Sequence, residues 1–449
     1  MTVGAMTSWS PDDPAFWQAR GRRVAHRNLW IAAPNLLVAF AVWTLWSVVV
    51  VTLPKTGFPL SPLQLFGLVA APGFAGAVLR LVYGLIAARV PARSFTVAST
   101  LALLLPALGI GIAVRDPGTP YAVMLGLAAL CGLGGASFAS SMTHLSVLFP
   151  RGEVGSALSL NSGLGSLGLS LAQFLVPIVI TLSLFGALAD GPQAMAMHGE
   201  LHPVWLQNAG FVWIPLIVLC ALLARFGMYE LPLQRRTVAE EHIFTQRRYW
   251  MLSFLYLGTF GSLIGYTAAF PLFASIQFPD VDVLQYVFLA PLLGALARPL
   301  GGWLANRHGG GQVTVASFAL MVVSALACLA FLPSGQSMGS FWGVLAAFSL
   351  LFFAAGLGSG SMFFLVPDLD NREAPVSLAR RNVRVVGRAI GMISAVGALG
   401  GVVIPMLLAL TLTALGGVQG AFLVFVLFYL LCMVCTWWCH VRERAHAES

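Results

Sequence analysis

Charged residues are scarce in this sequence of 449 residues. They make up 9% of the chain, whereas 58% of the residues are hydrophobic. A soluble globular domain carries about 25% charged residues, so the composition excludes an ordinary soluble protein. Apolar windows of roughly 20 residues recur along the chain, which is the length a helix needs to cross a hydrocarbon core about 30 Å thick. The sequence therefore predicts an all-α polytopic membrane protein.

Twelve apolar stretches are long enough to cross a bilayer. The first is too long for the apolar core of a signal peptide, and no small-residue cleavage site follows it, so we interpret it as a retained helix. No segment between the stretches is long enough for a soluble domain, which argues against an enzyme. The predicted stretches are 28–53, 63–88, 95–114, 121–149, 157–186, 204–229, 249–277, 283–306, 312–332, 341–366, 387–411 and 418–440.

Metal-binding patterns are weak. Cys432, Cys435 and Cys439 have helical spacing, but their neighbours are apolar and no acidic residue is near, which favours packing over a metal site. His198 and His202 share a predicted outer loop without a further clustered ligand, so solvated side chains are favoured there. All six cysteines fall within predicted stretches, so no disulfide framework is indicated. We expect no metal and no cofactor.

The net charge of +8 reflects topology and indicates no nucleic-acid site. Of the 24 lysines and arginines, only Lys55 and Arg115 lie on the side opposite the termini, and only Arg80 and Arg298 lie deep within the membrane. An excess of basic residues marks the cytoplasmic side of a membrane protein. We therefore expect both termini in the cytoplasm.

Arg80 and Arg298 lie deep within apolar stretches that contain no acidic residue. Each lies nine residues before the arginine that ends its helix, Arg89 or Arg307, and so about 14 Å deeper in the membrane. A charged side chain at that depth costs on the order of 3 kcal/mol. The missing counter-charge indicates a bound anion, and a forked, permanently charged guanidinium suits a small planar oxyanion. The alternative is that carbonyls or hydroxyls hold both groups for packing alone.

Two pairs of motifs repeat along the chain. R-x-x-x-G-x-x-A-x-R begins at Arg80 and again at Arg298, and a pattern of serine, small residue and glycine begins at Ser162 and at Ser394. The repeats predict two duplicated six-helix halves with a site at their interface. The predicted divisions are an arm at 1–27, a first half at 28–229, a linker at 230–248, a second half at 249–440 and a tail at 441–449.

For several residues near the expected site, the sequence allows two interpretations of their role. The small residues of the repeat can let helices pack closely or let the backbone close around a substrate, and they are Gly163, Gly165, Gly168, Ala395, Gly397 and Gly400. Hydroxyls can bind an anion or bond back to their own helix, and the candidates are Ser162, Ser166 and Ser394. His144, inside a stretch near its predicted cytoplasmic end, can carry a proton or make a structural hydrogen bond.

The chain resembles the nitrate/nitrite porter family of the major facilitator superfamily, of the NarK type. The resemblance covers nearly the whole chain. It rests on the two glycine motifs and on W-S-P-D-D-P-A-F-W at 9–17, R-N-L-W at 27–30, L-W-S-V at 45–48, F-A-S-S-M at 138–142 and S-F-L-Y-L-G-T-F-G at 253–261. Ser166 and Ser359 stand where the family usually has asparagine, which leaves affinity and the preference between nitrate and nitrite open.

The resemblance implies a transporter with twelve transmembrane helices in the bacterial inner membrane, whose partners are nitrate, nitrite and the lipid bilayer. It implies that Arg80 and Arg298 bind the anion and that Phe138 and Phe260 sandwich it. Tyr256 and a serine matching Ser394 would add hydrogen bonds, and the glycine motifs would permit alternating access. We expect the protein to work as a monomer.

The transport mode is left with alternatives. The lack of membrane carboxylates favours exchange of nitrate for nitrite, with bound anion relieving repulsion between the two arginines. His144 keeps proton-coupled nitrate import open. A sensor that binds the anion without moving it would need an output domain, for which no segment is available. An exporter of hydrophobic cations conflicts with a site of two arginines and no carboxylate.

Overall fold

The computed structural model describes residues 9–87, 89–185, 191–197, 200–230, 246–333, 338–366 and 383–442. Within these ranges twelve helices are long and apolar enough to cross a membrane, which confirms the predicted number. The first continuous helical run, Pro14–Thr52, begins inside the predicted arm. Most of the predicted linker and His198 lie outside the described residues.

The first six spans form one half of the bundle. Several of them are built from consecutive helices that bend or break within the membrane. The elements are α1 (Pro14–Phe16), η1 (Trp17–Gly21), α2 (Arg22–Trp43), α3 (Leu45–Thr52), η2 (Pro54–Thr56), α4 (Pro62–Ala87), α5 (Ala92–Ala102), α6 (Leu104–Ala113), α7 (Tyr121–Ser146), α8 (Arg151–Val179), α9 (Asn208–Phe211) and α10 (Trp213–Gly227).

The last six spans form the second half. As in the first half, some of these spans are built from consecutive helices. The elements are α11 (Arg247–Tyr256), η5 (Leu257–Gly261), α12 (Ser262–Gln277), η6 (Val283–Gln285), α13 (Leu289–His308), α14 (Gly310–Phe331), α15 (Phe341–Ser361), η7 (Met362–Phe364), α17 (Val383–Ala398), α18 (Gly400–Leu415), α19 (Gln419–Thr436) and η8 (Trp437–Arg442).

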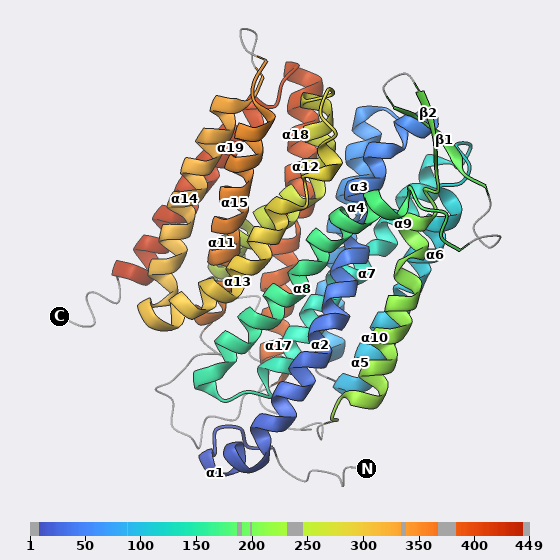
Figure 1. Cartoon of the computed structure of the whole chain (residues 1–449). Helices are drawn as coiled ribbons and strands as arrows, with labels where there is room; N and C mark the ends of the chain where they lie inside the picture. Colours follow the sequence, from blue (N-terminus) through green and yellow to red (C-terminus); the bar gives the residue numbers. More distant parts are fainter. Residues whose placement is uncertain are drawn as a thin grey trace.

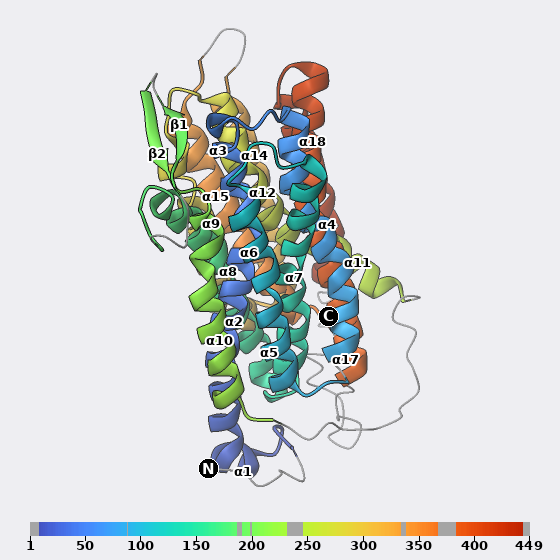
Figure 2. The same cartoon turned by 90° about the vertical axis from the view of Figure 1, so that its right-hand side faces the viewer.

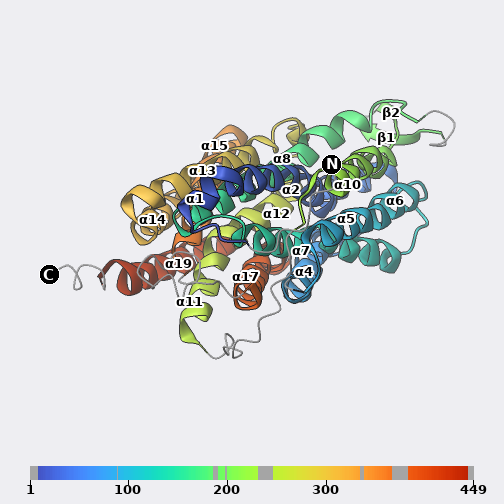
Figure 3. The same cartoon turned by 90° about the horizontal axis from the view of Figure 1, so that it is seen from below.

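The helices run roughly side by side along one long axis (Figures 1 and 2). Seen along that axis, the two halves lie next to each other, with α2, α8 and α12 between the outer helices (Figure 3). Large apolar side chains such as Phe226 and Leu427 are more than 60% exposed on the outside of the bundle. A surface of this kind is suited to lipid, so the protein is a multi-pass membrane protein.

The two ends of the bundle differ. We call the end that carries α1 the arm end, and the opposite end the hairpin end. At the hairpin end, β1 (Gln193–Met197) and β2 (Glu200–Val204) pair antiparallel, with Gln193 opposite Val204. The sequence predicts only an outer loop here, because the two strands are too short for a clear alternating pattern.

Local backbone features place the central side chains. Thr44, with φ −102° and ψ 7°, separates α2 from α3 directly after Trp43. Prolines inside α4 (Pro72) and α13 (Pro299) each remove one helical hydrogen bond. The π-helical turn η5 carries Phe260, and such turns are frequent at functional sites. These features lie next to the buried arginines, since Trp43 and Phe260 contact Arg80 and Pro299 directly follows Arg298.

Candidate functional site

Arg80 lies on α4 and is completely buried, with 0% of its surface exposed. Its Nε donates a hydrogen bond to the carbonyl of Gly135 on α7 at 2.9 Å. Its Nη1 donates to the carbonyl of Ser394 on α17 at 2.8 Å, and α17 belongs to the other half. The hydroxyl of Ser394 bonds to Gly391 in its own helix at 3.4 Å. In this structure Ser394 therefore meets Arg80 through its backbone.

Arg298 occupies the corresponding position on α13 and is also 0% exposed. Its Nη1 donates to the hydroxyl of Ser166 on α8, in the first half, at 2.9 Å. Its Nη2 donates to the hydroxyl of Tyr256 at 3.1 Å. Ser166 in turn donates to the carbonyl of Ser162 at 2.8 Å, so this hydroxyl bonds back to its own helix while its oxygen accepts from Arg298. Each arginine thus bonds to the opposite half.

The two guanidinium groups lie against the same aromatic rings. Their central carbons are 4.8 Å (Arg80) and 4.9 Å (Arg298) from the centroid of Phe260, and 4.8 and 5.8 Å from that of Phe138. The two positive charges are therefore within about 10 Å of each other, and buried charges at that distance are poorly screened by salt. The structure brings together the two arginines, both phenylalanines and Tyr256 as one cluster.

Each arginine keeps one N–H group without a hydrogen-bond partner among the described residues. These groups are Arg80 Nη2 and Arg298 Nε, and both are buried. An unpaired buried donor is costly, and more so when it is charged. The hydroxyl of Ser162, one turn before Ser166, is likewise buried without a partner. The carbonyls and hydroxyls that hold the other nitrogens are the contacts of the packing alternative, and these three groups lie beyond those contacts.

The aromatic rings are closely spaced. The centroids of Phe138 and Phe260 are 5.4 Å apart with an angle of 24° between the ring planes. Tyr256 also stacks on Phe260, at 5.0 Å and 9°. A planar group between two rings needs about 7 Å, which is twice the usual contact distance between carbons. To hold an anion between them, as the resemblance implies, Phe138 and Phe260 must therefore move apart by more than about 1 Å.

The matching family model and the curated relatives agree on the class of protein. Residues 35–383 match the model of the Major Facilitator Superfamily. The nitrate/nitrite transporter NarU of Salmonella typhimurium is 41% identical, over 98% of this chain and 96% of its own length. The probable nitrate/nitrite antiporter NarK2 of Thermus thermophilus is 37% identical, over 98% of this chain and 97% of its own length. The chain belongs to the NarK-type nitrate/nitrite porter family of the Major Facilitator Superfamily.

The fold is that of the superfamily. The human organic anion transporter MFSD10 superposes with a TM-score of 0.62 at 16% sequence identity, covering 92% of this chain and 99% of its own. At this identity the likeness establishes the fold alone. Since the superfamily and the curated relatives are transporters, this family member is a transporter and not an enzyme.

The glycines of the family motifs pack against different helices. A Cβ on Gly163 would lie 2.5 Å from Cδ of Pro299, so Gly163 lets α8 contact α13 across the two halves. Gly165 and Gly168 pack against α2 within the first half, and Gly397 and Gly400 pack against α11 and η5 within the second. Ala395 is buried on the same helix as Gly397. Among the five motif glycines, the contact between halves is therefore carried by Gly163.

The motif glycines four residues after each arginine also lie between the halves. A Cβ on Gly84 would be 2.7 Å from the carbonyl oxygen of Gly387, and one on Gly302 would be 2.4 Å from the hydroxyl of Ser159. The R-x-x-x-G repeat therefore has a physical reason in both copies. The arginine supplies the charge, and the glycine one turn later lets the opposite half approach.

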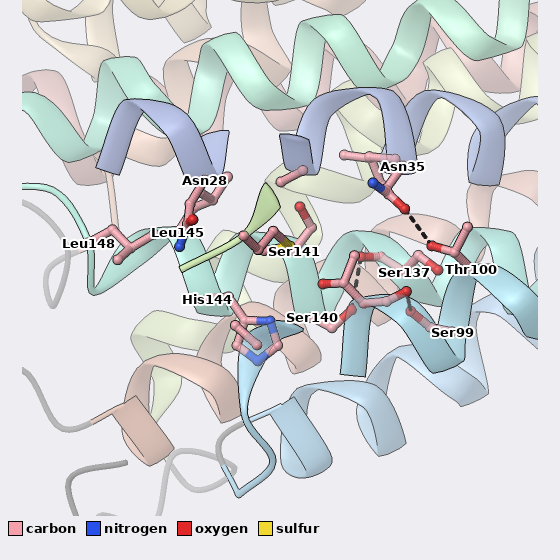
Figure 4. A pocket seen from close by; sticks show the side chains of 15 residues that line it. Asn28, Asn35, Ser99, Thr100, Ser137, Ser140, Ser141, His144, Leu145 and Leu148 are labelled. Atoms are coloured by element: carbon pink, nitrogen blue, oxygen red, sulfur yellow. Dashed lines mark hydrogen bonds between the residues drawn. The ribbon is translucent and has the colours of Figure 1, made fainter. Parts of the chain in front are cut away.

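His144 lies apart from the arginines. Its Nε2 is 2.9 Å from the carbonyl of Ala87, at the end of α4. The ring lines a cavity of about 30 Å³ inside the first half, whose lining includes neither arginine. Figure 4 shows this cavity extending from the region of Leu148 to the hydrogen bond between Thr100 and Asn35. The structure thus gives His144 the structural hydrogen bond that the sequence left as one alternative.

Two contacts of the site were not singled out from the sequence. The ring of Trp43 lies 5.0 Å from the guanidinium of Arg80, and its Nε1 donates to the carbonyl of Pro72 at 2.8 Å. A Cβ on Gly135, whose carbonyl accepts from Arg80, would be 2.5 Å from the Trp43 ring. With twelve tryptophans in the sequence, no local pattern distinguishes Trp43.

The described residues hold no cluster of three or more histidine, cysteine or acidic side chains that could bind a metal. Within that part of the chain His202 lies 3.9 Å from Glu200 on the exposed hairpin. The six cysteines are free thiols, four of them buried. The chemistry of the site therefore comes from arginines, aromatic rings and hydroxyls.

Proposed function

We propose that the chain transports nitrate and nitrite across the bacterial inner membrane. The proposal is that it exchanges one anion for the other by alternating access, as a monomer, with the anion bound between Arg80 and Arg298. The relatives support the substrates, since the curated names are nitrate/nitrite transporter for NarU and probable nitrate/nitrite antiporter for NarK2. Because these relatives cover nearly the whole chain, the same architecture is available here.

The observation that carries the proposal is the pair of unpaired N–H groups, Arg80 Nη2 and Arg298 Nε. A small planar oxyanion presents several acceptor oxygens, and charge-assisted hydrogen bonds to a guanidinium are roughly twice as strong as neutral ones. Since no carboxylate of the described residues bonds to either arginine, an anion would supply both the acceptors and the charge. A cation would meet two positive groups at this position.

Entry of the anion between Phe138 and Phe260 would separate the rings. Both arginines lie against Phe260, and each is tied to the opposite half through Ser394 or Ser166. In our mechanism the two like charges of the empty site repel each other in a medium of low dielectric. This repulsion raises the free energy needed for the two halves to rearrange. Bound anion offsets this repulsion, so the halves change conformation mainly when loaded, which is the condition for exchange.

We further propose that the arm end faces the cytoplasm. Arg20, Arg22 and Arg23 lie on η1 and the start of α2 at that end, whereas Lys55 lies on η2 at the other. Basic residues accumulate on the cytoplasmic side of membrane proteins. Under this orientation β1 and β2 would face the outside of the inner membrane.

Nitrate uptake into proteoliposomes tests the proposal. Vesicles preloaded with nitrite are compared with empty vesicles, each with and without an imposed proton gradient. Exchange predicts uptake that requires internal nitrite and ignores the gradient. Gradient-driven uptake into empty vesicles would replace exchange by proton symport and direct attention to His144. Binding of nitrate without uptake under any condition would replace transport by sensing.

A further inference from the structure

Three buried polar side chains on α8 contact the second half at regular spacing. Ser159, Ser166 and Gln173 are seven residues apart, and each is 0% exposed. Seven residues make nearly two helical turns, so the three side chains share one face, and neighbours are separated by about 10 Å along the axis. The middle residue is the partner of Arg298. The outer two therefore lie on either side of the arginine cluster.

At the arm end of this face, the hydroxyl of Ser159 donates to the carbonyl of Gly360 on α15 at 2.9 Å. Gly360 itself packs directly on the backbone of Arg298, since a Cβ there would overlap the arginine carbonyl at 2.0 Å. Ser159 also lies over Gly302, one turn beyond Arg298. This contact joins the two halves immediately next to the site.

At the hairpin end of the face, Nε2 of Gln173 donates to the carbonyl of Thr267 on α12 at 2.8 Å. The same nitrogen lies 3.3 Å from the hydroxyl of Ser47 on α3. The amide oxygen of Gln173 is buried without a hydrogen-bond partner in the described part of the chain. Opening of this end to water would give that oxygen a partner, so the closed contact is incompletely satisfied.

We propose that Ser159 and Gln173 are the two gate contacts of the transport cycle, and that they break alternately. The Gln173–Thr267 hydrogen bond would break when the hairpin end opens, and the Ser159–Gly360 hydrogen bond when the arm end opens. The contact of Ser166 with Arg298 lies between them. This inference rests on the alternating access of the proposed function, and it places both gates on one helix face.

Hydrogen–deuterium exchange of the full-length protein in nanodiscs tests the proposal. Gln173→Met keeps the side-chain length but removes the donor, and it should speed backbone exchange in the hairpin-end parts of α12 and α3. Ser159→Ala should speed exchange in the arm-end part of α15. Loss of one hydrogen bond shifts the equilibrium roughly 2- to 10-fold. Each variant should slow exchange at the opposite end.

Thr100→Val is the matched control, because it removes the buried hydrogen bond between Thr100 and Asn35 within the first half. It should leave the balance between the two ends unchanged. Equal acceleration at both ends by Gln173→Met and Ser159→Ala would show mere loosening and overturn the proposal, as would no change in either variant. If Gln173→Met does not fold, the milder Ser159→Ala decides alone.

The readout separates this inference from the proposed function. Hydrogen–deuterium exchange is measured without substrate. Opposite shifts in the exchange rates at the two ends therefore support the gate contacts even if the wild-type protein fails to carry nitrate. Conversely, nitrate exchange by the wild-type protein in vesicles, combined with a failure of the opposite shifts, would retain the function and reject Ser159 and Gln173 as gates.

Discussion

Replacing Arg298 by lysine separates the geometry of the site from its charge. The guanidinium of Arg298 donates to Ser166 at 2.9 Å and to Tyr256 at 3.1 Å, and its Nε remains free for an anion. A lysine has one compact ammonium group in place of this rigid fork. It cannot hold both hydroxyls and also present a donor in the direction of Nε. The charge is kept and the arrangement is lost.

The expected loss follows from the number of hydrogen bonds. A hydrogen bond to a charged group contributes about 1.5–3 kcal/mol, and the lysine forgoes at least one such bond to the anion. This corresponds to a roughly 10- to 150-fold weaker apparent affinity for nitrate. Because the bond to Ser166 also connects the two halves, we expect a lower maximal rate in addition.

The assay is the concentration dependence of nitrate uptake into nitrite-loaded proteoliposomes. Arg307→Lys is the matched control, because Arg307 lies on the same helix but is exposed and stacks on Trp303 at 4.1 Å. It should behave within twofold of the wild-type protein. Comparable melting temperatures ensure that both variants are folded. An Arg298→Lys protein with wild-type affinity and rate would refute the forked geometry as the basis of binding.

Two further substitutions test packing at and away from the interface. Gly163→Ala places a methyl group about 2.5 Å from Pro299. This overpacking destabilises the closed interface by about 1–3 kcal/mol and should reduce nitrate/nitrite exchange 5- to 150-fold. The control Gly152→Ala places its methyl group in open space and should be neutral. Unchanged uptake by Gly163→Ala would contradict this contact. Tyr429→Phe leaves the hydroxyl of Ser262, 2.7 Å away, without that partner and should lower stability by about 1–3 kcal/mol. Thermal unfolding measures this loss of stability, and the affinity for nitrate should stay at the wild-type value. A loss of affinity without a loss of stability would instead connect Tyr429 to the site.

The sequence predicted the spans and the two arginines because both have large energetic signatures. Long apolar runs and charges in them are visible without knowledge of the fold, and the repeat placed Arg80 and Arg298 in equivalent helices. The unusually early start of the first helix at Pro14 was not visible, because a hydropathy pattern reports only the apolar part. The hairpin of β1 and β2 was missed for a similar reason, since its strands are short and exposed.

The direction that each side chain faces could not be predicted. In a membrane helix the lipid-facing and protein-facing sides are both apolar, so periodicity does not separate them as it does in a soluble helix. Gly163 and Gly165 therefore looked alike in the sequence, although one contacts the other half and the other packs within its own. Trp43 and Gln173 were missed because their partners, Arg80 and Thr267, come from distant segments.

If the anion binds between Arg80 and Arg298 as we propose, their complete burial bears on how the protein distinguishes one anion from another. An ion that reaches these groups has left its hydration shell behind, and the protein returns only a small, fixed set of donors in exchange. Small or doubly charged anions bind water most strongly and lose most in this exchange. Under the proposed function, the order of preference among anions should therefore follow the ease of dehydration as well as size, and a loosely hydrated, flat, singly charged ion should bind best.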